Sequence, residues 1–304
     1  MRLFSRPSPP RGPNLPPVTP GIARLGTDDP RQLGPYRLRG LLGHGTAGPV
    51  YLGRGAARHG GRRRTAAVRA LRPELLRDRQ LRARLRHDLE AVRTRTAGPY
   101  LARPLDCELD SDRPWAAAEF VPGPSLAHLL GRYGPPPEAV VRVLGAALAH
   151  ALAELHAAGV VHGALRPTAV LVTADRPRVA DCALALDPLA EERGRPADDV
   201  FDLGVLLALT ASGGHHPFAG SLLPSAREDP DLTGVPSALH PVLLGCLHKV
   251  PGHRPAADAV AAWLDPAGTA WRPAREWLPQ DWLPALGAWA ALARELGGRR
   301  FLPW

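Results

Sequence analysis

The stretch that most constrains this chain covers residues 161–183 and reads VHGALRPTAVLVTADRPRVADCA. An apolar segment of helical length, residues 139–157, precedes it. Within the stretch, residues 170–180 form two short apolar runs around a turn. The pattern therefore predicts a long buried helix, a loop, and a tight β-hairpin that ends at Asp181.

The stretch resembles the catalytic centre of the bacterial, eukaryotic-like serine/threonine protein kinases, in which H-R-D-x-K-P-x-N precedes a hairpin and D-F-G. The matching segments here read HGALRPTA and DCA. Three catalytic positions of the family are degenerate in this chain: Ala164, Arg166 and Ala169. They stand where the family has its hydroxyl-orienting Asp, its phosphoryl-neutralising Lys and a metal-binding Asn. Asp181 keeps the family's metal-binding carboxylate, so the resemblance implies that it is a weak Mg²⁺ ligand.

Further kinase motifs follow the family's order along residues 35–264. A GHGTAGPV segment between two strand-like runs resembles the loop that covers the ATP phosphates, where glycines let the backbone approach oxygen atoms closely. Arg69, in AAVRAL, stands where the family has its phosphate-binding lysine. The apolar spacing over residues 81–95 predicts a helix that points Asp88 inward, and the resemblance then implies an Arg69–Asp88 ion pair.

Residues 114–126 resemble the family's fifth strand, its hinge and the start of the next helix, with hinge backbone groups that meet the adenine edge. The resemblance implies one set of nucleotide-binding residues: Gly43, Gly45, Gly48, Val50, Ala67, Arg69, Asp88, Glu119, Val121 and Leu171. ATP is the expected ligand, and we expect it to bind weakly, with Mg²⁺ as its companion ion.

The chain departs from the family after Asp181. Residues 184–198 contain neither an A-P-E motif nor any Ser, Thr or Tyr, so they cannot carry the usual phosphorylation switch. The family resemblance resumes at DVFDLG, which begins its central helix. Arg254 lacks the A-P-E glutamate that normally pairs with it, which leaves Glu191 and Glu192 as possible partners.

The resemblance implies an α+β, bilobal protein-kinase-like fold, with a small β-rich N-lobe that has one helix and a larger helical C-lobe. We expect the lobes at about 34–118 and 122–264, preceded by a disordered, basic, Pro-rich arm over 1–33. Residues 265–304 hold five of the seven tryptophans and one amphipathic helical pattern. That helix either docks on the large lobe, which is the favoured expectation, or presents a surface to a partner.

The charge balance is strongly basic, with a net charge of +9 and Lys249 as the only lysine among 38 basic residues. Arginines concentrate in the first third of the chain, which suggests non-specific contacts with anionic partners. Solvated arginines without such a role are the simpler interpretation. The three cysteines, Cys107, Cys182 and Cys246, lie far apart and predict free thiols in a cytoplasmic protein. No run of eighteen apolar residues occurs, so we expect no membrane span.

Three functions are compatible with these residues. The favoured interpretation is a pseudokinase, a catalytically impaired module that senses nucleotide or acts as a scaffold or regulator for protein partners of a signalling pathway. The alternative is a divergent serine/threonine protein kinase with residual ATP-dependent phosphotransfer. The third is a basic nucleic-acid-binding protein. Asp181 and the glycine loop favour nucleotide contact, whereas Ala164 and Ala169 favour impaired catalysis.

Overall fold

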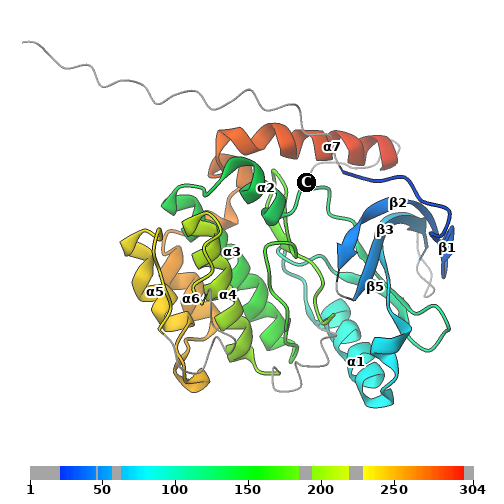
Figure 1. Cartoon of the computed structure of the whole chain (residues 1–304), viewed down its shortest axis with the longest axis horizontal. Coiled ribbons are helices and arrows are strands. Elements are labelled where there is room, and N and C mark those ends of the chain that lie inside the picture. The colour runs from blue at the N-terminus through cyan, green and yellow to red at the C-terminus, as the bar shows by residue number, and fades with distance from the viewer. Residues whose placement is uncertain (1–20, 46, 57–62, 185–193, 219–228, 298–304) are drawn as a thin grey trace, which may run out of the picture.

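The computed structural model describes residues 21–45, 47–56, 63–184, 194–218 and 229–297. These residues form a β-rich small lobe and a larger helical lobe, joined by the connection that follows β6 (Figure 1). The strands are β1 (Gln32–Leu33), β2 (Tyr36–Gly45), β3 (Gly48–Gly55), β4 (Arg64–Ala70), β5 (Pro104–Glu108), β6 (Trp115–Glu119), β7 (Val170–Val172) and β8 (Pro177–Val179). The helices are α1 (Arg79–Arg95), α2 (Leu126–Tyr133), α3 (Glu138–Ala157), α4 (Pro196–Ser212), α5 (His240–Cys246), α6 (Ala257–Leu264) and α7 (Leu283–Gly297).

The small lobe is one antiparallel sheet in the order β1-β2-β3-β4-β6-β5, with α1 beside it. Alternate side chains of its strands point to one face, as the period of two along a strand requires. Leu38, Tyr51 and Val68 are buried there against Trp115. The expected architecture, a sheet with one long helix next to a helical lobe, is confirmed among the described residues.

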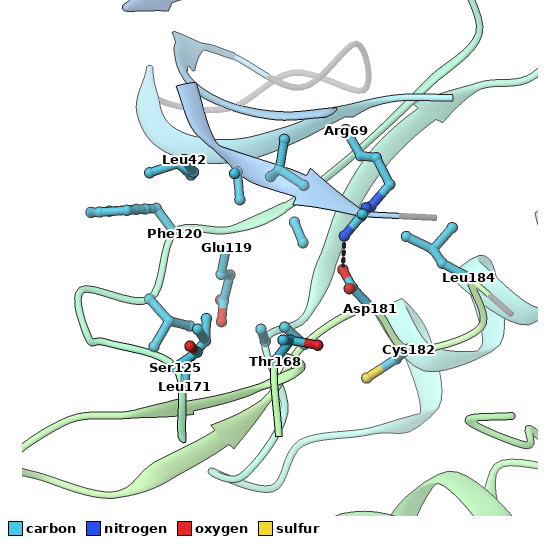
Figure 2. Close-up of a pocket in the computed structure, with 18 of the residues that line it drawn as sticks. Leu42, Arg69, Glu119, Phe120, Ser125, Thr168, Leu171, Asp181, Cys182 and Leu184 are labelled. Atoms are coloured by element: carbon cyan, nitrogen blue, oxygen red, sulfur yellow. Dashed lines mark hydrogen bonds and ion pairs between the residues drawn. The ribbon is translucent and has the colours of Figure 1, made fainter. Parts of the chain in front are cut away.

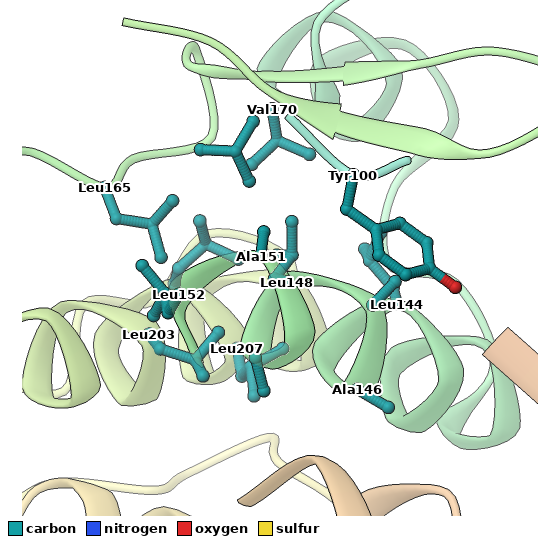
Figure 3. Packing of buried hydrophobic residues seen from close by; sticks show 14 of the residues in the cluster. Tyr100, Leu144, Ala146, Leu148, Ala151, Leu152, Leu165, Val170, Leu203 and Leu207 are labelled. Carbon is teal, nitrogen blue, oxygen red and sulfur yellow. The ribbon is translucent and has the colours of Figure 1, made fainter. Parts of the chain in front are cut away.

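The large lobe is built around α3, which agrees to within one residue with the helix predicted over 139–157. Leu144, Leu148 and Leu152 are each at most 1% exposed, and they pack with Leu203 and Leu207 of α4 (Figure 3). Among the described residues, α3 is the one helix long and apolar enough to span a membrane, but 67% of its apolar window is buried inside the protein. It is therefore the core helix of this lobe.

The sequence places residues 21–33 in a disordered arm, but part of this segment joins the sheet. Residues 1–20 lie outside the described residues, but the next segment is part of the sheet, where Ala23 and Leu41 exchange backbone hydrogen bonds of 2.9 and 2.8 Å. The two-residue β1 pairs with the start of β2. The sequence did not predict this pairing, because residues 21–33 have little apolar periodicity of their own and become ordered through hydrogen bonds to the sheet.

In the described part of the C-terminal segment, helix α7 packs on the domain, which is the favoured of the two expected arrangements. Trp282, the residue just before α7, is 1% exposed in the core of the large lobe, and Leu286 of α7 is equally buried. Ala293 is 2% exposed, but it packs with Leu52 of β3 in the small lobe. In Figure 1, α7 crosses from above the large lobe to the strands of the small lobe. The helix therefore joins both lobes, which the amphipathic pattern alone does not indicate.

Candidate active site

A cavity of about 780 Å³ lies between the two lobes. Its roof comes from β2, β3 and β4, its back wall from β6 and the connection to α2, and its floor from β7 and the segment at Asp181. Apolar atoms dominate the lining, as is usual for pockets that hold small molecules. Figure 2 shows Leu42 and Phe120 at one end of this cavity and the side chains of Arg69 and Asp181 at the other.

Most of the residues predicted to bind nucleotide line this cavity together. They are Gly43, Gly45, Val50, Ala67, Arg69, Glu119, Val121 and Leu171, and the predicted metal ligand Asp181 lines it too. Gly48 and Asp88 do not line it. Gly48 has φ +132°, and a Cβ there would lie 1.9 Å from the carbonyl oxygen of Ala70. The packing of the sheet therefore requires glycine at this position.

Arg69 does not pair with Asp88, so that prediction was wrong. Its guanidinium forms an ion pair with the Asp181 carboxylate and also donates to the carbonyl oxygen of Gly48 at 3.1 Å (Figure 2). Asp88 instead meets Arg84, one turn earlier on α1, at 3.6 Å. Burial raises the pKa of Asp88, and Arg84 opposes this shift. Arg69 is only 7% exposed, so its charge needs a close carboxylate, and the geometry supplies Asp181.

The segment that presents Asp181 is held from the large lobe. His162 is fully buried and its Nε2 lies 2.9 Å from the carbonyl oxygen of Ala180, the residue before Asp181. Asp199, in the first turn of α4, accepts hydrogen bonds from the backbone N–H groups of His162 and Gly163 at 2.8 and 2.7 Å. A carboxylate is also stabilised at a helix N-terminus by the helix dipole. Asp181 is therefore fixed through His162 to the start of α4.

The sequence indicates Asp199 only as the first residue of the DVFDLG helix motif, and its anchoring role was not predicted. The signal was available, because a carboxylate in the first turn of an otherwise apolar helix is buried only if it is hydrogen-bonded. Thr168 was also missed: it lines the cavity (Figure 2). A single hydroxyl in a loop carries no pattern that sequence reasoning can detect.

The degenerate catalytic positions differ in their relation to the cavity. Arg166 lines it, whereas Ala164 and Ala169 do not. Ala169 is 1% exposed, and its backbone N–H and carbonyl groups pair with Arg166 and Ala180 at 2.9 and 2.8 Å. Alanine side chains at these two positions can neither accept a proton nor hold a metal ion.

The partner of Arg254 is Asp198 of α4. Its Nη1 lies 3.3 Å from the Asp198 carboxylate and 2.9 Å from the carbonyl oxygen of Ala197. Glu191 and Glu192, the partners proposed from sequence, lie outside the described residues. Residues 185–193, most of the segment without an A-P-E motif, are also outside them, so the expectation that this segment carries no phosphorylation switch stays a prediction.

Known proteins that resemble this chain are serine/threonine-protein kinases by name. No protein-family model matches the chain. It is 35% identical over 318 residues to the serine/threonine-protein kinase AfsK of Streptomyces griseus, across 92% of this chain and 37% of that protein. It is 32% identical to the probable serine/threonine-protein kinase PkwA of Thermomonospora curvata, across 83% of this chain and 37% of that protein. The chain therefore spans little more than a third of these relatives.

A solved structure gives the fold. The PknI kinase domain of Mycobacterium tuberculosis superposes with a TM-score of 0.65 at 22% identity, covering 77% of this chain and 96% of that domain. The expected protein-kinase fold is thereby confirmed. The favoured interpretation of the sequence as a pseudokinase is contradicted, because the relatives at 32–35% identity are named serine/threonine-protein kinases and the match extends over most of the chain. Their names support the alternative, a divergent kinase.

Proposed function

Because this chain is a relative of the bacterial serine/threonine protein kinases and has the protein-kinase fold, we propose that it is a divergent serine/threonine protein kinase. It binds ATP in the cavity between the lobes and transfers the terminal phosphoryl group slowly to protein hydroxyl groups. The observation that carries this proposal is the convergence of Arg69 and Asp181 at one end of an apolar cavity. Phosphoryl transfer needs a cation for the phosphates and a carboxylate for their metal ion, and these two residues supply them.

The cavity fits a purine nucleotide in volume and in chemistry. Val50 and Ala67 of the roof and Leu171 of the floor offer apolar surfaces to the two faces of the base. The backbone at Glu119 and Val121 lies along the back wall, where it would meet the polar edge of the base. The phosphates would then extend toward Arg69, beneath the glycines of β2.

One carboxylate at Asp181 fits a nucleotide-bound Mg²⁺, since Mg²⁺ is commonly held by one or two carboxylates together with substrate phosphates. Bound Mg²⁺ would neutralise phosphate charge. The ion pair between Arg69 and Asp181 has to open for Asp181 to take that ligand role, and Arg69 is then free to turn to a phosphate. Ala169 adds no side-chain oxygen, so we expect weak affinity for the metal–nucleotide complex.

The same residues predict a low rate. Ala164 cannot orient a substrate hydroxyl or accept its proton, and the loss of one such group typically costs about 10²–10⁴-fold in rate. Arg166 lines the cavity and keeps a positive charge on the side where the phosphoryl group moves. The chain therefore keeps groups that position the nucleotide and neutralise its phosphate charge. The proton of the substrate hydroxyl would have to pass to solvent or to the substrate itself.

The test is phosphate incorporation from γ-labelled ATP by the full chain, into itself and into a generic basic protein, with Mg²⁺ and with Mn²⁺. The control is Asp181→Asn, which keeps the shape of the side chain and removes its charge. We expect incorporation above that control, confined to serine and threonine, and an increase of tenfold or more in Ala164→Asp because a proton acceptor is restored. Incorporation equal to Asp181→Asn in both wild type and Ala164→Asp would reject the proposal.

A further inference from the structure

Helix α7 lies outside the lobes that form the cavity, yet it contributes to the cavity wall. Trp289, in the middle of α7, lines the cavity together with Leu42 of β2 and Phe120 of the connection between the lobes. The rings of Trp289 and Phe120 lie 6.5 Å apart at an interplanar angle of 44°. This is within the range in which aromatic pairs attract each other. Trp289 is therefore held against the cavity by a specific ring contact.

Both ends of α7 are anchored, which fixes the position of Trp289. At the first end, Trp282 and Leu286 are each 1% exposed in the core of the large lobe. At the other end, Ala293 packs with Leu52 and Phe120, and Arg54 of β3 donates to the carbonyl oxygen of Leu296 at 3.0 Å. A side chain midway between two such anchors keeps its place in the wall.

The N-terminal segment reaches the same end of the cavity. Gly21 lines the cavity, and Ile22 packs in the cluster that contains Phe120 and Ala293. Segments before and after the two lobes thus converge on the end of the cavity marked by Phe120 in Figure 2, opposite the Arg69–Asp181 pair. Phosphates belong at the end with Arg69, so the base and ribose of a nucleotide belong near Phe120.

We propose that Trp289 is a nucleotide-recognition residue, whose indole contacts the base–ribose part of an adenine nucleotide at the outer end of the cavity. The proposal rests on the proposed function in so far as both place a nucleotide in this cavity, but it needs no phosphoryl transfer. A ring already held by Phe120 loses little freedom when a ligand packs on it, so the contact stabilises the complex at low entropic cost. The indole has no charge, so it acts on the nucleoside part and not through the phosphates.

The experiment is isothermal titration of the full chain with adenosine and with ATP. Trp289→Ala is expected to weaken adenosine binding about tenfold, the size typical of one base–aromatic contact. Trp289→Phe keeps a ring and is expected to stay within about threefold of wild type. The matched control is Trp263→Ala on α6, a 48% exposed tryptophan that does not line the cavity, which should leave the affinity unchanged.

A second measurement separates contact from a merely loosened helix. Adenosine is expected to change the tryptophan fluorescence of the wild type, and this change should disappear in Trp289→Phe although that variant still binds adenosine. Melting temperatures of all variants show whether the fold is intact. Unaltered adenosine affinity in a folded Trp289→Ala variant overturns the proposal, and so does a wild type that binds neither adenosine nor ATP.

The outcomes also separate this proposal from the proposed function. A wild type that binds adenosine through Trp289, while neither it nor Ala164→Asp incorporates phosphate above Asp181→Asn, rejects the kinase function and leaves the recognition residue in place. A wild type that transfers phosphate, with adenosine binding unaffected by Trp289→Ala, rejects Trp289 and leaves the kinase function in place.

Discussion

At the scale of single residues, the segment at the floor of the cavity has an unusual backbone. Asp181 and Ala183 both have φ +63°, in the left-handed region. Aspartate reaches this region more readily than most residues, but the Cβ of alanine comes too close to the following carbonyl oxygen. The glycine of the D-F-G motif would adopt it freely, and this chain has alanine instead. The segment that presents Asp181 therefore contains a strained residue.

Ala183→Gly is expected to stabilise the protein by roughly 0.5–1 kcal/mol. The left-handed conformation costs a non-glycine residue about 1–2 kcal/mol, whereas glycine gives the unfolded chain about 0.4–1 kcal/mol of additional entropy. Urea unfolding measures the difference. The control is Ala158→Gly at the end of α3, where φ is −78° and glycine should destabilise instead. A lower midpoint for Ala183→Gly would contradict the role of strain.

His150 of α3 gives the fold a dependence on pH. Its ring lies 6.0 Å from that of Tyr100 and 4.8 Å from that of Trp271, and burial lowers its pKa below the ordinary 6.5, with Asp265 opposing the shift. The unfolded chain therefore binds the proton more readily, so stability should fall as the pH drops through about 6.5 and below. When the pH is lowered from 7.5 to 5.5, the melting temperature of His150→Phe should fall less than that of the wild type. Equal losses in both proteins would show that His150 does not carry the effect.

At the scale of elements, capping side chains mark the residues at which α1 and α2 begin. Helix α1 begins two residues earlier than the apolar pattern predicts, because Asp78 caps it: its Oδ1 accepts from the backbone N–H of Gln80 at 2.8 Å. Ser125 caps α2 in the same way, accepting from the backbone N–H of His128 at 3.2 Å. Each cap satisfies a backbone donor that has no partner within its helix.

Asp78→Ala is expected to cost about 1 kcal/mol of stability, the usual value for a lost N-cap side chain. Asp78→Ser keeps an oxygen that can accept from the same N–H group and should restore most of that loss. Urea unfolding of the two variants beside wild type checks this. Asp78 is remote from the cavity lining, so ATP affinity should not change. Equal destabilisation by Ala and Ser would mean that the cap contributes nothing.

At the scale of the whole molecule, contacts on several sides hold the lobes together. Glu154 of α3 accepts hydrogen bonds from the backbone N–H groups of Ala97 and Gly98, just after α1. Helix α7 packs on both lobes, and Arg69 of the sheet pairs with Asp181 of the large lobe. Opening of the cavity therefore has to break or stretch polar contacts on more than one side.

The net charge of +9 also acts at this scale. We expect binding to double-stranded DNA to be independent of sequence and strongly weakened by salt, because arginine–phosphate contacts release counterions. Fluorescence anisotropy at 50 and 200 mM salt should show an affinity loss of about 10³-fold or more if six or more phosphates are contacted. A complex specific for one sequence that persists at 200 mM salt would instead support a nucleic-acid-binding function.

The sequence by itself determined the bilobal fold, and nine of the eleven residues that it proposed for nucleotide or metal binding line one cavity. Glycines, hydrophobic periodicity and the order of the kinase-like motifs are local properties, and Gly43, Ala67, Leu171 and Asp181, which they singled out, lie around one cavity. Their roles in nucleotide and metal binding stay predictions. The start of α3 was predicted to within one residue for the same reason. Local sequence patterns were sufficient to predict an element wherever residues close in the chain determine its conformation.

Only the tertiary structure decided which charges meet and which distant segment completes the cavity. Arg69 forms an ion pair with Asp181 and not with Asp88, and Arg254 forms one with Asp198. A long guanidinium side chain pairs with whichever carboxylate the fold brings within reach. Trp289 follows Phe120 by well over a hundred residues, and no spacing rule relates the two. Their contact depends on the course of α7 across both lobes, which is a property of packing and not of sequence periodicity.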